Sequence, residues 1–235
     1  MRITTIVTII SYNIKIWING LFGNKFNILP YKVLFNLTNN CNSKCISCDI
    51  WQVKDFEDEM NINDISKFFD SIGPSLIWLA LSGGEVTLVK YVESMIIEAR
   101  KKCKNLKIIS FTTNALLPRK VIWLAEKIIE NGFDLIVTIS LDGDKEIHDR
   151  VRGVPGNYEK CVALFDDLKK IGVNVNYGIT VSDQNNSFIH NEYRKMRHSI
   201  KAVTFVHDDG IYLKENKTDN ELMLDSMRHI AKHYS

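Results

Sequence analysis

From Pro30 onward, short apolar runs alternate with longer segments in which apolar residues recur at helical spacing. Some of the short runs are apolar on nearly every residue, such as LIWLAL and LIVTISL, a pattern typical of strands that are buried on both faces. The short runs predict six strands, over residues 31–37, 76–81, 106–111, 135–141, 173–181 and 202–206.

Strands that alternate with helices are typical of βαβ units, so we expect an α/β fold with a parallel sheet. Six units are fewer than the eight of a closed TIM barrel. In parallel α/β folds ligands bind beyond the carboxyl ends of the strands, so we expect the chemistry in the loops after the strands. The helical segments fall at about 62–72, 87–104, 117–131, 157–171, 185–199 and 218–233.

We divide the chain into an N-terminal segment, residues 1–29, and one domain, residues 30–235. Residues 3–14 carry no charge, but Lys15 interrupts the apolar pattern and no small-residue cleavage site is present. No run reaches the roughly 18–20 apolar residues that a spanning helix needs. We expect an amphipathic or buried helix packed on the barrel. Contact with a membrane surface is the less favoured alternative, because the segment has few Lys or Arg residues.

Composition narrows the class of protein but indicates no particular partner. A chain of 235 residues, 45% apolar and 25% charged, fits one barrel-sized domain or two small ones. The formal net charge is only +2. The basic clusters fall at predicted helix ends, where they complement the helix dipole. We therefore expect no nucleic-acid binding.

Candidate chemistry is concentrated in one loop, CNSKCISC, which contains Cys41, Cys45 and Cys48. The chain has five cysteines, and the other two, Cys103 and Cys161, fall in predicted helices and are expected to be small buried hydrophobic residues. Three thiolates can hold three corners of a cubane-type iron–sulfur cluster and leave one iron open for chemistry.

Two other interpretations of the three cysteines have less support. A zinc site usually pairs CxxC with a second pair of ligands such as another CxxC, and the sequence contains no second CxxC. A disulfide is disfavoured by the odd number of cysteines and by the lack of a signal peptide. Crowded thiols suit a reducing compartment, so we expect a cytoplasmic protein with an iron–sulfur site.

The CxxxCxxC spacing resembles the signature of the radical S-adenosylmethionine (SAM) enzymes, in which the open iron takes the amino and carboxylate groups of SAM. A second motif supports this resemblance: Ser82-Gly83-Gly84-Glu85 ends the second strand, roughly 35 residues after the cysteines. A lone GGE sequence would more often be a tight turn. The resemblance implies that Gly83, Gly84 and Glu85 form a surface for the methionine amino group of SAM.

Later strand ends carry further motifs of this kind. Asn114 follows the third strand, where the family often has Thr-Asn-Gly, and an ordinary turn is an equally good explanation. SLDG, with Ser140 and Asp142, and HDRVRG, with Arg152, resemble segments of peptide-modifying and SPASM-type members. The resemblance implies that Ser140, with Asp142, contacts the ribose and that Arg152 pairs with the SAM carboxylate through a bidentate fork.

Some positions depart from the family pattern or match it weakly. Ser47 stands where the family has a bulky residue that packs near the adenine, and Trp51 either compensates or belongs to the core. Ala115 makes the turn after the third strand less permissive than glycine would. We interpret residues 148–150 as a solvated loop network. In relatives, the loops that match residues 180–185 lie near the adenine of SAM. The resemblance therefore implies, weakly, that residues 180–185 also lie near the adenine.

The resemblance covers nearly the whole chain from Pro30 and implies an open, partial barrel of six βα units. It implies a [4Fe-4S] cluster and SAM as cofactors, a one-electron reductant such as flavodoxin or ferredoxin, and anaerobic chemistry. A 5′-deoxyadenosyl radical would abstract hydrogen from an unknown peptide or small-molecule substrate. The cysteine-rich C-terminal extension of many relatives is missing, so we expect one cluster. The alternative is a non-catalytic iron–sulfur or zinc-binding module that retains the fold.

Overall fold

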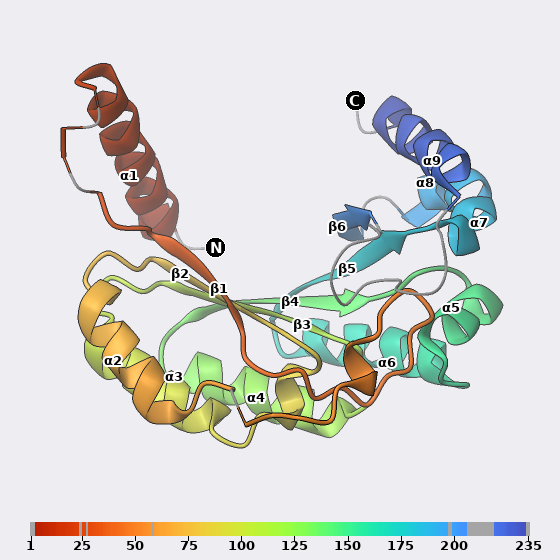
Figure 1. Cartoon of the computed structure of the whole chain (residues 1–235), viewed down its shortest axis with the longest axis horizontal. Coiled ribbons are helices and arrows are strands. Elements are labelled where there is room, and N and C mark those ends of the chain that lie inside the picture. The colour runs from red at the N-terminus through yellow and green to blue at the C-terminus, as the bar shows by residue number, and fades with distance from the viewer. Residues whose placement is uncertain are drawn as a thin grey trace.

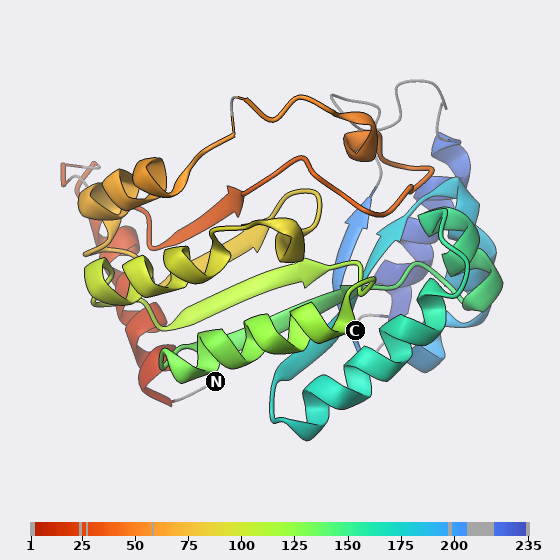
Figure 2. The ribbon, with the colours of Figure 1, turned by 90° about the horizontal axis from the view of Figure 1, so that it is seen from below.

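The computed structural model describes residues 3–23, 25–26, 28–57, 59–196, 199–205 and 219–233. Within them, six parallel strands form one sheet in the order β1-β2-β3-β4-β5-β6. The sheet curls into an open, partial barrel (Figure 1, Figure 2), which confirms the fold class expected from the sequence. The strands are β1 (Lys32–Asn36), β2 (Trp78–Ser82), β3 (Ile108–Thr113), β4 (Asp134–Ser140), β5 (Asn174–Val181) and β6 (Ile200–Phe205).

Helices cover the outer, convex face of the sheet. Figure 1 shows α2, α3, α4 and α6 side by side along this face, whereas α7 and α9 lie on the side of the sheet where β5 and β6 are found. The described helices are α1 (Ile3–Leu21), α2 (Ile62–Ile72), α3 (Val92–Lys102), α4 (Pro118–Glu130), α5 (Lys145–Arg152), α6 (Asn157–Lys170), α7 (Asn186–Asn191), α8 (Tyr193–Met196) and α9 (Asn220–His233), with short 3-10 turns η1 (Ile50–Gln52), η2 (Val86–Leu88) and η3 (Asp183–Asn185).

The two faces of the sheet differ, which corrects the expectation that the strands are buried on both faces. Along β4, Val137 and Ile139 are fully buried under the helices, whereas Thr138 and Ser140 alternate with them and remain partly exposed. A closed barrel would fill its interior with side chains. Because this sheet does not close, its concave face stays accessible.

One helix was missed in the sequence and one was divided. Residues 148–150 lie in α5 rather than in a solvated loop. Asp144 caps this helix by accepting from the Ile147 amide at 3.0 Å, and Gly153 ends it at a φ of 64°. The helix expected over 185–199 is instead η3, α7 and α8, in an Asn-rich stretch whose side chains bond locally. Residues 197–198 and 206–218 lie outside the described residues.

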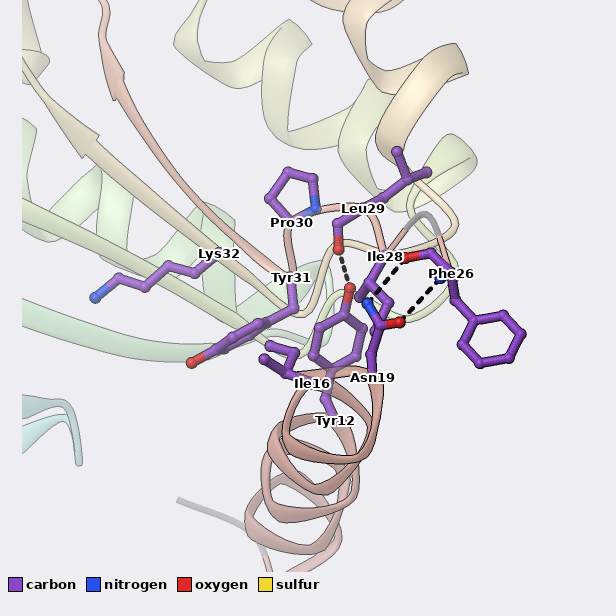
Figure 3. A pocket seen from close by; sticks show the side chains of 9 residues that line it. All are labelled: Tyr12, Ile16, Asn19, Phe26, Ile28, Leu29, Pro30, Tyr31 and Lys32. Atoms are coloured by element: carbon purple, nitrogen blue, oxygen red, sulfur yellow. Dashed lines mark hydrogen bonds between the residues drawn. The ribbon is translucent and has the colours of Figure 1, made fainter. Parts of the chain in front are cut away.

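The N-terminal segment forms α1, and its packing on the barrel is limited. Thr5 donates a hydrogen bond to Asp134 at 3.1 Å, and the Tyr12 hydroxyl donates to the Leu29 carbonyl. The Tyr12 ring lies 4.9 Å from that of Tyr31, at the entry to β1 (Figure 3). The separation of residues 1–29 from the barrel stays a prediction.

Much of the apolar surface of α1 is exposed. Ile3, Ile10 and Trp17 are 80%, 53% and 66% exposed. A helix fully packed on the barrel would bury such residues, so the predicted packing applies only to its first turn and to the contacts near β1. None of the described helices is long and apolar enough to cross a membrane.

The difference between the faces predicts unequal costs for the same substitution on β4. Ile139→Ala, on the helix-covered face, should lower the free energy of unfolding by about 2–5 kcal/mol, because it leaves a cavity in the core. Ile136→Ala, on the concave face, should cost about 1 kcal/mol, because Ile136 is only partly buried. Urea denaturation of both variants measures the difference. Equal losses would contradict this description of the sheet.

Candidate cofactor site

A pocket of about 430 Å³ lies at the carboxyl edge of the sheet, where ligands were expected. The three cysteines of the loop line it together with residues at the ends of several strands. Ser140, Asn114 and the two glycines of the GGE turn all contribute, whereas Glu85 and Asp142 do not. The lining comprises Leu34, Cys41, Ser43, Cys45, Ser47, Cys48, Ile50, Trp51, Ser82, Gly83, Gly84, Thr112, Thr113, Asn114, Ser140, Arg152, Thr180, Thr204 and Phe205.

The middle of the cysteine loop is bound to the end of α5. The Lys44 amide donates to the Arg152 carbonyl at 3.1 Å, and the Ile46 amide donates to the Val151 carbonyl at 2.9 Å. The buried Ser43 hydroxyl also donates to the Arg152 carbonyl, at 3.2 Å. Gly153 approaches so closely that an added Cβ would collide with the Lys44 carbonyl. The HDRVRG segment therefore positions the loop that holds Cys45.

The beginning of the loop is bound to the GGE turn. The Gly84 amide donates to the Thr38 carbonyl at 2.6 Å, and the Glu85 amide donates to the Asn40 carbonyl at 2.9 Å. A Cβ on Gly83 would meet the Thr38 carbonyl, and one on Gly84 would meet that of Asn40. The two glycines thus permit a close approach of backbones, and this contact fixes the residue just before Cys41.

Glu85 lies beneath the pocket rather than in it. Its carboxylate is 1% exposed and accepts from the Thr87 amide and hydroxyl, the Thr113 hydroxyl and the Asn114 amide, at 2.8–3.2 Å. Burial raises the pKa of Glu85, and these hydrogen bonds oppose that change. Glu85 does not line the pocket, so the contact between Glu85 itself and the SAM amino group stays a prediction. Glu85 ties the end of β2 to the end of β3.

Asn114 links that buried carboxylate to the cysteines. Its backbone amide donates to Glu85, and its side-chain amide donates to Asn42 at 2.8 Å and lies 3.9 Å from the Cys41 sulfur. Ala115, the next residue, is buried with a φ of 61°, the conformation that glycine adopts most easily. The turn expected to be less permissive therefore forms with the alanine in the left-handed region.

Asp142 and Arg152 form an ion pair beside the pocket. The Arg152 Nε lies 2.7 Å from the Asp142 carboxylate, and its Nη1 lies 3.7 Å from the Cys45 sulfur. The other Asp142 oxygen accepts from the Thr180 amide at 2.9 Å, and the side chain is 2% exposed. Asp142 thus orients Arg152 instead of reaching the pocket. The predicted contact between Arg152 and the SAM carboxylate stays a prediction, although Arg152 lines the pocket.

A buried polar network that the sequence analysis missed connects Asp142 to Asn114 beneath the pocket. His148 is fully buried, its Nδ1 accepts from the Asp142 amide at 3.1 Å, and its Nε2 therefore carries the proton toward Asn157 at 3.1 Å. Asn157 in turn donates to the Asn114 carbonyl at 2.9 Å. The histidine of HDRVRG was the available sequence signal.

Three features test whether the pocket fits an iron–sulfur cluster. The Trp51 indole nitrogen is buried at the pocket wall and has no hydrogen-bond partner in the described structure. It can therefore donate a hydrogen bond to a ligand in the pocket. Burial raises the pKa of Cys41 to about 11 and raises that of Cys48, which favours the thiol form, and a metal bound there would release these protons. No three His, Cys, Asp or Glu side chains in the described residues could hold one metal ion together. A cubane instead takes one thiolate at each of three irons.

The remaining cysteines differ from those of the loop. Cys103 and Cys161 are 2% and 0% exposed, as expected of small buried hydrophobic residues. Burial raises their pKa values to about 11 and about 12. Neither lines the pocket, so the donor set is limited to the three cysteines of the loop.

Comparison with known proteins identifies the class. The family model described as Radical SAM superfamily matches residues 35–187, which include every motif discussed above. The chain belongs to this superfamily of enzymes, which use a [4Fe-4S] cluster and SAM.

Individual relatives are similar over part of their length. Fe-coproporphyrin III synthase of Methanosarcina barkeri is 31% identical over 158 residues, which cover 65% of this chain and 37% of that protein. Pre-heme d1 synthase of Dinoroseobacter shibae is 32% identical over 160 residues, with coverages of 66% and 37%. The chain thus spans less than half the length of these relatives.

The fold has counterparts among solved structures. Streptococcus suis SuiB, bound to its precursor peptide SuiA, superposes with a TM-score of 0.66 at 15% identity. The match covers 94% of this chain and 50% of SuiB. At this identity the comparison supports the fold.

The contact between Gly153 and Lys44 predicts a specific defect in cluster assembly. Gly153→Ala should lower the iron bound after anaerobic reconstitution to about half or less, because the new methyl group displaces the cysteine loop. Gly156→Ala is the matched control: Gly156 also has a positive φ, of 77°, but a Cβ there meets nothing within 4 Å. Both variants carry backbone strain of about 1–2 kcal/mol. Normal iron content in Gly153→Ala would contradict the role assigned to this contact.

Because His148 is buried, we expect the free energy of unfolding to fall in mild acid. Burial, assisted by the charge of Arg152, lowers the pKa of His148, so the native state keeps it neutral while the unfolded chain takes up a proton below about pH 6.5. Stability should be constant above that pH and fall below it by up to about 1.4 kcal/mol per pH unit. Denaturation between pH 8 and 5.5 measures this, with His148→Gln as the reference. A wild-type profile no steeper than that of His148→Gln would exclude the effect.

Proposed function

We propose that this chain carries a [4Fe-4S] cluster on Cys41, Cys45 and Cys48 and binds SAM in the adjoining pocket. The observation that carries the proposal is the convergence of the three thiols, the GGE turn and Ser140 on one pocket at the carboxyl edge of the sheet. The number of thiols supports an iron–sulfur cluster with one open iron, and membership of the superfamily supports SAM as its ligand.

The pocket residues divide into those that would touch SAM and those that hold them in place. Gly83, Gly84, Asn114 and Ser140 line the pocket, so they are the proposed contacts with SAM. Glu85 acts indirectly: its hydrogen bonds fix the turn that presents these groups. Asp142 has the same indirect role for Arg152.

The bound cofactors would supply reductive cleavage of SAM and abstraction of hydrogen from the substrate. The protein contributes the surroundings. Arg152 places a positive charge beside the Cys45 sulfur, where it would offset the negative charge of the thiolate ligands of the cluster. Trp51 and Ile50 shield one side of the pocket from water. The electron donor would be a small protein reductant such as flavodoxin or ferredoxin.

Two substrate classes follow from the relatives. The two enzymes that are 31–32% identical to this chain are named as synthases of tetrapyrroles, Fe-coproporphyrin III and pre-heme d1. SuiB, in contrast, was solved in complex with a precursor peptide. The higher identity favours a tetrapyrrole or a similar small molecule over a peptide. The alternative, a module that binds a cluster without catalysis, is supported by Ser47, a small residue that leaves one pocket wall without the bulky side chain usual in the family.

Anaerobic reconstitution tests the proposal. The purified protein should bind about four irons with matching sulfide, and Cys45→Ala should bind almost none. Addition of SAM should change the electron paramagnetic resonance spectrum of the reduced cluster, and 5′-deoxyadenosine should accumulate with dithionite. Cys103→Ala, which removes a buried thiol outside the pocket, is the control.

Each outcome separates the alternatives. One zinc without sulfide would overturn the cluster assignment. A cluster whose spectrum is unaffected by SAM would overturn the SAM assignment. A spectrum that responds to SAM without formation of 5′-deoxyadenosine would favour the non-catalytic module.

A further inference from the structure

The concave face of the sheet is polar over much of its area, unlike the apolar convex face. Strand pairing places its residues in rows across the sheet, because register partners share a face. One row joins Ser82 to Asn36, and another joins Thr112, Thr138 and Asn176. A parallel sheet packed against a second apolar layer would bury hydrophobic residues here. This face can therefore contact a ligand that carries polar groups.

Lys32 is a cation on this face. It begins β1, pairs in register with Trp78, and places its ammonium 4.0 Å from the centre of the Trp78 ring. The Trp78 indole in turn donates to the Ser110 hydroxyl at 2.8 Å. Residues of three neighbouring strands thus orient the lysine over the sheet, which lowers the side-chain entropy that ligand binding would cost.

The ammonium of Lys32 is available to a ligand. In the described part of the chain no carboxylate lies within ion-pair distance of the Lys32 ammonium. Strand pairing places Asp134 in the same row across the sheet, but on β4, three strands away, where it accepts a hydrogen bond from Thr5. Figure 3 shows the Lys32 side chain extending away from Tyr12 and Ile16 of α1. It lines a second pocket, of about 520 Å³, that lies between α1 and the segment leading into β1.

The inward face of β1 connects the two pockets. Leu34 lines the pocket that contains the cysteines, and Lys32 lines the pocket beside α1. Lys32 and Asn36, at the two ends of β1, are about 13 Å apart at 3.3 Å per residue. Because the ammonium is held over Trp78, its register partner, it does not reach toward the cysteines. A molecule of amino-acid size would not contact both ends.

We propose that Lys32, held over Trp78, binds a carboxylate of the substrate at the end of the barrel opposite the cysteines. The proposal rests on the function proposed above and narrows its substrate to an extended molecule that bears a carboxylate. A tetrapyrrole with carboxylate side chains and a peptide with an acidic residue share this chemistry. Lys32 is thereby a specificity-determining residue, distinct from the residues that hold the cofactors.

The adjoining side chains suit the body of such a molecule. Leu34 is 64% exposed beside the path, and Tyr31 and Ile16 line the pocket at its far end. Across the sheet, the Thr138 hydroxyl donates to Asn176 at 3.2 Å. An apolar strip that ends in a cation is complementary to an amphipathic, carboxylate-bearing substrate and not to a cationic one.

Binding to the reconstituted, SAM-loaded protein tests the proposal without requiring turnover. The probes are coproporphyrin III, its tetramethyl ester, and a synthetic glutamate-containing peptide paired with the same peptide carrying glutamine. Binding is followed by porphyrin fluorescence or by the anisotropy of a labelled peptide. The variants are Lys32→Met and Lys32→Arg. Lys169→Met is the matched control, because Lys169 also lies over an aromatic ring, Phe165 at 4.8 Å, but on α6 of the outer layer.

Lys32→Met should weaken binding of the carboxylate probe at least tenfold, Lys32→Arg should stay within about threefold of wild type, and Lys169→Met should match wild type. The probe that binds identifies the source of the carboxylate. The ester or the glutamine peptide should bind more weakly and be insensitive to Lys32→Met. Equal binding by Lys32→Met and wild type would overturn the proposal, and so would no wild-type preference for either carboxylate probe. Failure of the cluster and SAM assays would instead overturn the proposed function.

Discussion

The whole site depends on main-chain hydrogen bonds that hold a loop without regular secondary structure. The cysteine loop is bound at its beginning to the GGE turn and at its middle to the end of α5. Both contacts require glycine, because backbones meet there at distances that exclude a Cβ. A cubane needs its thiolates at defined positions before it can bind without a large entropic cost, and these clamps supply that order.

A second layer of buried polar groups makes the clamps rigid. The carboxylates of Glu85 and Asp142 are almost fully buried, which is unfavourable unless each oxygen has a partner. Each of them has hydrogen bonds or an ion pair from neighbouring strand ends, and His148 and Asn157 connect the two groups. Removal of one member would leave others unsatisfied, so the network behaves as a unit.

The open form of the sheet decides what lies beside this site. A sheet of six strands that does not close leaves its concave face accessible along the length of the strands. The pocket with the cysteines lies at the carboxyl end of that face, and the pocket beside α1 lies at the start of β1. Cofactor chemistry and substrate selection can therefore be assigned to different ends of one surface, joined by β1.

Local pattern was sufficient to predict the alternation of strands and helices and the motifs that meet at the carboxyl edge, because each of these is encoded in a short stretch of the chain. The partial barrel followed from the resemblance of those motifs to a known family. Local pattern did not separate residues that face the pocket from residues beneath it. Glu85 and Asp142 were assigned to SAM because their motifs imply contact, but which way a side chain points depends on partners such as Thr113 and Arg152 that are distant in sequence. The same holds for His148, which only folding buries, and for Lys32, whose neighbour Trp78 comes from another strand. Periodicity reports which residues share a face, whereas the packing of distant segments sets what that face contacts.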